Sequence, residues 1–478
     1  MKSILSISLF LLAFVPCLGQ LEINDVFADP QSCTYMTRDI FVVWWDNSND
    51  YSEEVDILLD QMIEYRGICL DELNMADPPN PIDGYYYNVY LHGDGGHFDQ
   101  YGWGNGQGTD SNGYPYLTLP YWLIDDLVNL SHETFHIFQY NATSPGFGYS
   151  GDSQWYIEAS ANWFAARENP GAERAFIEGE SLVRIPSVPL WLSYDNFPSS
   201  YPQNWQRYVH QYAMAMFLHY LTDVAQIPEN LIADGFFTGT ELYPQEYLSE
   251  EIGSEAFKNY FMDWAIHMTN DFDFITPIQA AANEQEWNNY ADPLDDHEFI
   301  ETWIDEGTQD WYTPSEDVTT NGWSFNTYKL ENSQQETYHF ELAGETEGYF
   351  ASPSRFMGRI LVQHSNGEAT FYELPMADAI NGSLSLELSP EDETIYFVVG
   401  SVPDVFEDVE SVFELFPYQI RITKGVLSIT GNELGVPNKQ EIGRYNLLGQ
   451  LVDKTYPGIQ IILYQDGSSR KVVYTEPD

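Results

Sequence analysis

The six residues SHETFH, at positions 131–136, constrain this chain more than any other stretch of its sequence. They lie within residues 122–140, where apolar side chains recur with the period of an α-helix. Because His132 and His136 are four positions apart, a helix places both imidazole rings on one face, one turn from each other. Two rings placed in this way can bind one zinc ion at about 2.0–2.1 Å. The fold therefore has to bring a further ligand against this face of the helix.

Glu158 is the residue that the sequence offers as that ligand. It lies in a second predicted helix, residues 155–167, which follows a connection rich in Gly, Pro and Ser. A catalytic zinc ion normally takes three protein ligands and keeps one open position. Glu133 stands beside the first histidine, where a carboxylate can accept a proton from an activated water and pass it to a leaving amine. We therefore expect one catalytic Zn²⁺ and peptide-bond hydrolysis with Glu133 as the general base. The metal ligands are then His132, His136 and Glu158.

Two further interpretations of the same helices stay open. Asn162 lies one turn after Glu158, so its amide oxygen is expected to accept the spare ring N–H of a liganding histidine. Alternatively, the motif arose by chance. In that case both histidines hydrogen-bond on a solvated helix face, and Glu133 is ordinary surface charge.

The motif of His132, Glu133 and His136, followed by Glu158 on a later helix, resembles the gluzincin branch of zinc metallopeptidases, the thermolysin-like superfamily. The resemblance covers residues 35–310, and its specific motifs lie only in the two helices. It implies an α+β zincin-like catalytic domain that acts on a protein or peptide substrate. It implies fold and reaction class, but not which substrate is cleaved.

The resemblance extends to residues that assist the reaction. In gluzincins a Tyr or His donates a hydrogen bond to the oxyanion. Tyr212 is our choice for this role over Tyr208 and His210. The alternative is that all three side chains simply pack in a helical core. Residues 116–121 are expected to form an edge strand that pairs with an extended peptide, or a plain sheet edge. The superfamily usually carries an acidic residue where Asn162 stands.

Composition and patterning divide the chain into four parts. Residues 1–20 have one basic residue, an apolar run and a final small residue, which is typical of a secretory signal peptide. Residues 21–317 hold the two helices and are assigned to the zincin-like metallopeptidase domain. Short alternating strands between turns predict an all-β sandwich domain at residues 318–424. Residues 425–478 follow as a small β domain, in which basic residues are more frequent.

The last of these parts has a resemblance of its own. The segments RYNLLGQLVDK and PGIQIILYQDGSSRKVV are similar to the carboxy-terminal sorting domain of type IX secretion substrates. The resemblance implies that the type IX secretion machinery is a partner and that the protein is secreted or attached to the cell surface. One more small β domain without a sorting role is the alternative.

The acidic composition excludes nucleic acids and anionic membranes as expected partners. The chain has 74 Asp and Glu against 18 Lys and Arg, a formal charge of −56, which nucleic acids and anionic membranes repel. After the signal, no stretch is long and apolar enough to span a bilayer. Asp94, Asp99 and Asp110 in a Gly-rich segment could bind Ca²⁺, or form a solvated acidic loop. Cys33 and Cys69 could form a disulfide in an oxidising compartment, or stay as two buried thiols.

Two other functions compete with the peptidase. Aromatic residues make up 16% of the chain, and the sandwich suits a non-catalytic surface or carbohydrate-binding protein with a structural or vestigial metal site. A zinc hydrolase that cleaves a bond other than a peptide is the third candidate.

Overall fold

The computed structural model describes most of the chain between residues 21 and 474. The described ranges are residues 21–149, 153–172, 187–198, 205–270, 272–276, 301–303, 310–406, 413–425, 441–445, 451–452, 458–464 and 469–474, together with residues 182 and 185. The predicted signal peptide, residues 1–20, lies outside them. The chain divides into two compact units, Met1–Lys424 and Gly425–Asp478.

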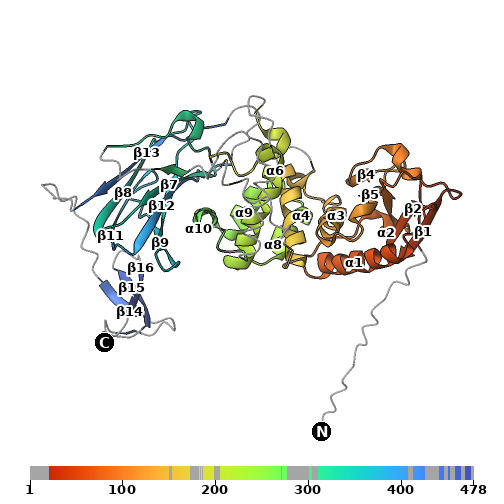
Figure 1. The fold of residues 1–478 in the computed structure, drawn as a ribbon, viewed down its shortest axis with the longest axis horizontal. Coiled ribbons are helices and arrows are strands. Elements are labelled where there is room, and N and C mark those ends of the chain that lie inside the picture. The colour runs from red at the N-terminus through yellow and green to blue at the C-terminus, as the bar shows by residue number, and fades with distance from the viewer. Residues whose placement is uncertain are drawn as a thin grey trace, which may run out of the picture. The chain divides into compact units, whose positions relative to one another are not determined.

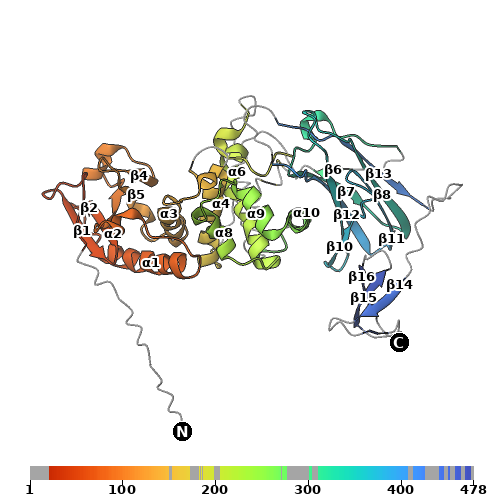
Figure 2. The ribbon, with the colours of Figure 1, turned by 180° about the vertical axis from the view of Figure 1, so that it is seen from behind.

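A five-stranded sheet opens the first unit (Figures 1 and 2). Its elements are β1 (Cys33–Arg38), β2 (Phe41–Asp46), α1 (Ser52–Asp71), α2 (Pro79–Ile82), β3 (Tyr87–His92), β4 (Gly106–Thr109) and β5 (Pro115–Pro120). The strand order is β1-β2-β3-β5-β4. The three central strands run parallel, with α1 crossing between β2 and β3, whereas the outer strands β1 and β4 are antiparallel to their neighbours.

Both faces of this sheet are buried, and successive side chains along a strand point to opposite faces. Phe41, Val43 and Trp45 point into the main core, which α1 and the later helices share. Val42 and Trp44 point to the opposite face, into an aromatic cluster. Because neither face is solvated, β2 is apolar at every position from Phe41 to Trp45, as is typical of parallel strands.

The strand predicted at the edge of the sheet is an interior strand. β5 contains most of residues 116–121, and it pairs with β3 on one side and with β4 on the other. The edge is β4, whose sequence GQGT lies in a Gly-rich segment that the composition predicts to be loop. Glycine is rare in strands, so no local propensity indicates β4, and its pairing with β5 alone creates it.

Cys33 and Cys69 are two free, buried thiols. Cys33 begins β1 and packs in the aromatic cluster, whereas Cys69 lies near the end of α1 in the main core. The disulfide that the even pair allows is not formed, because the sheet separates the two residues. Burial raises the pKa of both thiols, which favours the protonated form.

Helices follow the sheet. They are α3 (Leu127–Gln139), α4 (Gln154–Glu168), α6 (Trp205–Ala213), α7 (Ala215–His219), the π-helical turn η7 (Tyr220–Val224), α8 (Asn230–Asp234), α9 (Pro244–Ile252) and α10 (Ser254–Thr269). α3 and α4 lie side by side, and α3 packs against α1, β4 and β5 (Figures 1 and 2). Both helices predicted from the apolar period are therefore present, and α4 also contacts α6 and α7.

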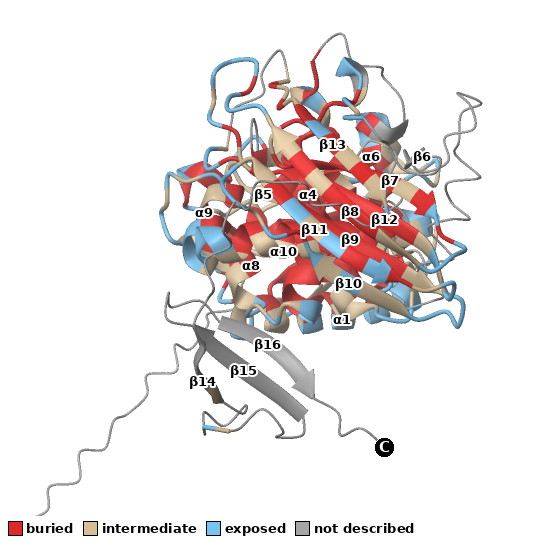
Figure 3. Ribbon diagram, turned by 90° about the vertical axis from the view of Figure 1, so that its left-hand side faces the viewer, coloured by how far each residue is buried: buried red, intermediate tan, exposed pale blue. Residues whose placement is uncertain are grey.

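The C-terminal part of the first unit is rich in β structure. Its strands are β6 (Glu301–Trp303), β7 (Ser324–Glu331), β8 (Glu336–Gly344), β9 (Phe356–His364), β10 (Ala369–Glu373), β11 (Asn381–Leu388), β12 (Asp392–Ser401) and β13 (Tyr418–Lys424). They form two sheets, β10-β9-β12-β7-β6 and β11-β8-β13, with antiparallel pairing throughout except between β6 and β7. Phe340 of β8 and Phe397 of β12 meet in the core between the sheets, and β12 is buried along most of its length (Figure 3).

The outer face of the five-stranded sandwich sheet is covered by α10. Val398 of β12 belongs to the same main core as Phe261 and Trp264 of α10. The buried side chain of Arg359 donates a hydrogen bond from Nε to Asp263 at 2.7 Å across this contact. The predicted boundary between residues 317 and 318 therefore lies within one compact unit, because a core and an ion pair cross it.

The second unit holds a three-stranded antiparallel sheet. Its strands are β14 (Glu441–Tyr445), β15 (Gly458–Tyr464) and β16 (Ser469–Tyr474), with β15 in the centre. Among the described residues, no helix combines the length and the apolar character needed to cross a membrane.

Candidate metal centre

α3 carries the SHETFH run in a buried stretch. The helix starts after Asp126, whose carboxylate accepts a hydrogen bond from the backbone N–H of Asn129 at 3.2 Å. The side chains of the motif are then enclosed: His132 is 9% exposed, Glu133 6% and His136 5%. Polar and charged groups that are this deeply buried require partners.

α4 brings Glu158 to those histidines. The helix is buried on nearly all sides, and Glu158 is only 6% exposed. The connection before it is anchored rather than loose: the backbone N–H of Thr143 donates to the carbonyl of Phe236 at 2.9 Å. A Cβ at Gly146 would lie 1.9 Å from the carbonyl oxygen of Leu242, so only glycine fits there.

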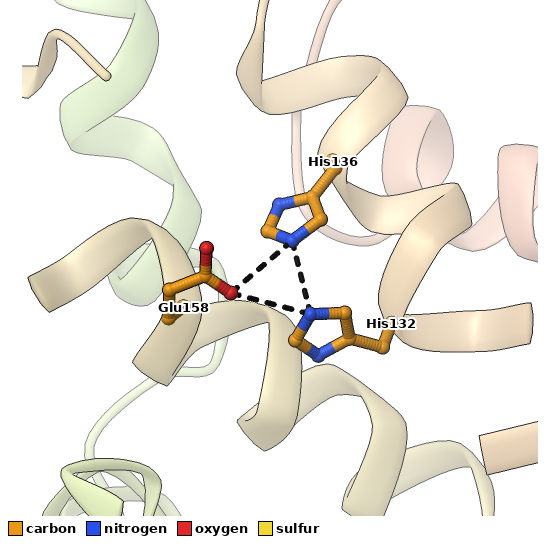
Figure 4. Close-up of side chains that lie close together, drawn as sticks. All are labelled: His132, His136 and Glu158. Carbon is orange, nitrogen blue, oxygen red and sulfur yellow. Dashed lines mark hydrogen bonds and ion pairs between the residues drawn. The ribbon is translucent and has the colours of Figure 1, made fainter. Parts of the chain in front are cut away.

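Three ligand atoms converge between the two helices (Figure 4). The Nε2 atoms of His132 and His136 are 3.0 Å apart, and Oε2 of Glu158 lies 3.4 Å from the first and 3.5 Å from the second. Two ligands that are each about 2.0–2.1 Å from a tetrahedral zinc ion are about 3.3–3.4 Å from each other. His132, His136 and Glu158 therefore form a group that could hold a metal ion, and its spacing fits zinc.

Each histidine is oriented through its other ring nitrogen. Nδ1 of His132 lies 2.8 Å from Oδ1 of Asn162, which is the contact that the sequence predicts. Nδ1 of His136 lies 2.6 Å from Oε1 of Gln139, which sequence reasoning missed. The Gln139 amide donates to the carbonyl of Ile157 at 3.1 Å and to Oγ of Ser160 at 2.8 Å, so its oxygen faces the ring. Both Nδ1 atoms are thus donors, and both Nε2 atoms are left to bind a cation.

Glu133 lies beside the group without belonging to it. Its Oε1 accepts a hydrogen bond from Nδ2 of Asn105 at 2.7 Å, whereas its buried Oε2 has no hydrogen-bond partner among the described residues. Gln107 of β4 donates to the backbone carbonyl of Glu133 at 3.3 Å. One carboxylate oxygen is therefore held in place, and the other is available for a proton or a water.

The field at the site favours positive charge. Burial by itself disfavours a charged imidazole, but the Glu158 carboxylate, with a smaller contribution from Glu133, raises the pKa of His136 to about 9. Burial would likewise raise the pKa of Glu158, yet the two histidines hold it well below its usual range. A site that binds a proton this firmly also attracts a metal cation.

Two phenols border the ligand group. The ring centroid of Tyr212, on α6, lies 6.2 Å from that of His132, and the hydroxyl of Tyr149 lies 3.5 Å from Oε1 of Glu158. Desolvation and the charge of Glu158 raise the pKa of both phenols, so both are donors at neutral pH. Tyr149 was not predicted, because nothing in its local sequence marks it.

The other predicted assistants point elsewhere. Tyr208 is 49% exposed, and its ring lies tilted against that of Tyr212, with the centroids 6.0 Å apart. Nε2 of His210 lies 3.1 Å from the carbonyl oxygen of Pro189, and burial lowers its pKa to about 4. His210 is therefore a neutral core residue. Two residues apart on a helix, His210 and Tyr212 point to opposite sides, so only one of them can face the metal centre.

The three aspartates of the Gly-rich segment do not gather into a metal group. Among the described residues, His132, His136 and Glu158 form the group found, and it contains none of the three. Asp99 accepts a hydrogen bond from the backbone N–H of Gly95 at 2.6 Å, and Asp110 accepts one from that of Tyr114 at 2.9 Å. Asp94 accepts one from Nδ2 of Asn49 at 2.9 Å. Their carboxylates therefore organise turns of the chain.

Comparison with known proteins gives weak structural similarities. The chain is similar to the M60 catalytic domain with two CBM51 domains of Clostridium perfringens ZmpB, with 8% identity, a TM-score of 0.26, and coverage of 92% of this chain and 67% of that one. It is also similar to the pre-peptidase C-terminal domain of a Bacillus anthracis collagenase, with 8% identity, a TM-score of 0.17, and coverage of 25% and 92%. The CBM22-1 xylan-binding domain of Paenibacillus barcinonensis Xyn10C matches with 10% identity, a TM-score of 0.16, and coverage of 25% and 86%.

These scores carry no inference about function. No curated protein matches the sequence. A family of unknown function (DUF6055) matches residues 34–428. This range covers the N-terminal sheet from its second residue on, the candidate metal centre and both sheets of the sandwich. The chain therefore belongs to the family of unknown function (DUF6055).

Proposed function

We propose that this protein is a zinc-dependent metallopeptidase with a zincin-like catalytic part. The observation that carries the proposal is the triangle of His132 Nε2, His136 Nε2 and Glu158 Oε2, with sides of 3.0, 3.4 and 3.5 Å, beside the buried carboxylate of Glu133. Structural zinc sites are normally closed by four protein ligands, whereas catalytic sites have three. The described residues supply three ligands, with a free carboxylate oxygen of Glu133 beside them, and this supports catalysis over a purely structural role.

The residues divide the chemistry between them. Zinc held by the three ligands would supply Lewis acidity at the scissile carbonyl and lower the pKa of a water toward about 7. Glu133, whose Oε2 has no partner within the described part of the chain, accepts the proton of the attacking water and delivers it to the leaving amine. We propose Tyr212 as the donor to the developing oxyanion, with Tyr149 as the second phenol at the site.

The proposed substrate is a protein or an extended peptide. Among the described strands, β4 pairs only with β5, which leaves its other side open to a further strand, and Gln107 of β4 contacts the backbone of Glu133. We propose that the substrate adds to β4 as a further strand, in place of the edge role predicted for residues 116–121. Backbone pairing at β4 would align an extended peptide with Glu133.

The proposal includes export of the protein. The signal pattern of residues 1–20 and the resemblance of residues 425–478 to type IX sorting domains support a secreted or cell-surface protein handled by the type IX machinery. The three-stranded sheet β14-β15-β16 is consistent with a small β sorting module. Mass spectrometry of the native protein is the direct check: both terminal segments should be absent from the mature chain.

The decisive experiment measures zinc and cleavage together. The purified protein should contain one zinc per chain and cleave casein, and a zinc chelator should abolish cleavage reversibly. Glu133→Gln should keep the zinc and lose the activity, because it removes the base without touching a ligand. Glu54→Gln, an exposed residue of α1, is the matched control and should behave as wild type. A zinc-free wild type, or equal cleavage by all samples, would refute the proposal.

A carbohydrate-binding role is the second candidate, and one observation favours it. Tyr349 and Phe350 are 55% and 60% exposed on the connection between β8 and β9. The backbone N–H groups of Phe350 and Ser352 donate to Oε1 of Glu414 at 3.0 and 3.1 Å, which holds this connection in place. Exposed rings on a fixed loop can stack on sugars. Binding to a glycan array that Tyr349→Ala and Phe350→Ala abolish, without cleavage of any protein, would support this function instead.

A further inference from the structure

We propose that Asn105 is a positioning residue for Glu133: it holds one carboxylate oxygen so that the other faces the reacting atoms. The inference rests on the proposed function, because a positioned base has a purpose only at a hydrolytic site. Asn105 lies directly before β4, in the segment GWGNGQG, where the sequence shows no feature beyond its glycines.

The two oxygens of Glu133 have different surroundings. Oε1 accepts the hydrogen bond from Asn105 Nδ2 at 2.7 Å, and Oε2 is buried without a partner among the described residues. A carboxylate with two unfixed oxygens can rotate about its last side-chain bond. With Oε1 fixed, rotation stops, and Oε2 keeps one direction. The hydrogen bond therefore turns a mobile carboxylate into an oriented acceptor.

The backbone around Asn105 is itself fixed. The hydroxyl of the buried Thr118, on β5, lies 2.7 Å from the carbonyl oxygen of Gly104 and 3.0 Å from that of Gly106. Nε2 of His92, on β3, lies 3.1 Å from the same carbonyl of Gly104. The residues on both sides of Asn105 are thus tied to interior strands of the sheet, although Asn105 itself is exposed.

A second contact ties this segment to the motif. Gln107, two residues further on, donates from Nε2 to the backbone carbonyl of Glu133 at 3.3 Å, and its Oε1 accepts a hydrogen bond from the hydroxyl of Tyr87. The start of β4 therefore contacts both the side chain and the backbone of Glu133. Neither contact involves a residue of the proposed ligand group, so losing them should leave the ligands in place.

Kinetics of the full-length, zinc-loaded protein test the inference. Asn105→Ala should lower kcat by about 10- to 100-fold, as expected for a misplaced catalytic group, with KM and zinc content unchanged. Asn105→Asp keeps the size but removes the donor and places a like charge beside Glu133, so it should lose at least as much. Asn112→Ala is the matched control: Asn112 is an exposed asparagine between β4 and β5, and the variant should keep wild-type kinetics.

Binding of acetohydroxamate provides a readout that does not depend on hydrolysis. This probe chelates zinc and donates a hydrogen bond to a carboxylate beside the metal. Asn105→Ala should weaken its binding by about 10-fold in calorimetry, and the effect should vanish in the Glu133→Gln background, because the two residues then act on one interaction.

The outcomes separate this inference from the proposed function. If wild type cleaves casein and Asn105→Ala matches it in kcat and in hydroxamate affinity, Asn105 does not position the base, and the peptidase proposal stands. If the zinc-loaded wild type cleaves nothing while Asn105→Ala still weakens the probe in a Glu133-dependent manner, positioning stands and the peptidase proposal falls. A loss of zinc in Asn105→Ala would also overturn the inference, because it would show a structural role.

Discussion

Replacing Gln139 tests whether the predicted ligand geometry depends on a residue outside the ligand group. Its side chain is 2% exposed and makes three hydrogen bonds: one with Nδ1 of His136, one with the carbonyl of Ile157 and one with Oγ of Ser160. Gln139→Leu keeps the approximate volume and removes all three. The His136 ring then loses the acceptor that fixes which nitrogen faces the metal.

Two effects follow. Removing the partner of a liganding histidine should weaken zinc binding by about 10- to 100-fold, which corresponds to about 1.4–2.7 kcal/mol. The buried Nδ1–H of His136 also loses its partner, which costs about 1–3 kcal/mol, whereas the carbonyl of Ile157 lies within α4 and keeps its helical hydrogen bond. The free energy of unfolding of the metal-free protein should therefore fall by about 1–3 kcal/mol.

Zinc affinity is measured by competition with a chromogenic chelator, and unfolding by urea titration of the chelator-treated protein. Gln245→Leu is the matched control, because Gln245 is a buried glutamine of α9 outside the metal centre. It should change stability without changing zinc affinity. Wild-type zinc affinity in Gln139→Leu, or an equal loss in both variants, would refute the assigned role of Gln139.

Three further predictions concern charge, phenols and packing. In the metal-free protein, the pKa of His136 is raised to about 9 from an ordinary value of 6.5, so its contribution to stability is full below pH 6.5 and is lost as the pH rises to 9. The loss should reach at most about 3 kcal/mol in unfolding titrations, and should be absent with zinc, because the metal replaces the proton. Tyr212→Phe should lower kcat by about 10- to 100-fold in casein cleavage, and Tyr149→Phe by less than about threefold. The reverse order would assign the oxyanion donor to Tyr149. Arg359→Met should cost about 2 kcal/mol of stability, because it breaks the partly buried hydrogen bond to Asp263, and it should leave zinc content unchanged. A variant as stable as wild type would show that this pair does not join α10 to the sandwich.

Local sequence predicted much of the fold because the signals were periodic. The apolar repeat of residues 122–140 and 155–167 corresponds to α3 and α4, and the alternating runs after residue 318 correspond to β8–β13. These signals depend on neighbours within one or two turns, so they survive without knowledge of the rest of the chain. β4 was missed for the same reason: its four residues include two glycines, and only pairing with β5 makes them a strand.

Part of the candidate site could likewise be predicted from the sequence. The spacing of His132 and His136 on one helix, with Glu133 beside the first, follows from the geometry of a single helix and was readable from the sequence. The histidine partner Asn162 was also within reach, because it lies one turn from Glu158.

Tertiary structure alone decided the rest. The 3.0–3.5 Å separation of the ligand atoms requires α3 and α4 to pack closely, and the separation of Cys33 from Cys69 depends on the sheet that lies between them. Asn105 reaches Glu133 because β4 adds to the edge of that sheet. A helix places its own residues by a local repeat, whereas contacts between distant segments depend on how whole elements bury their surfaces, and no short stretch of sequence records that.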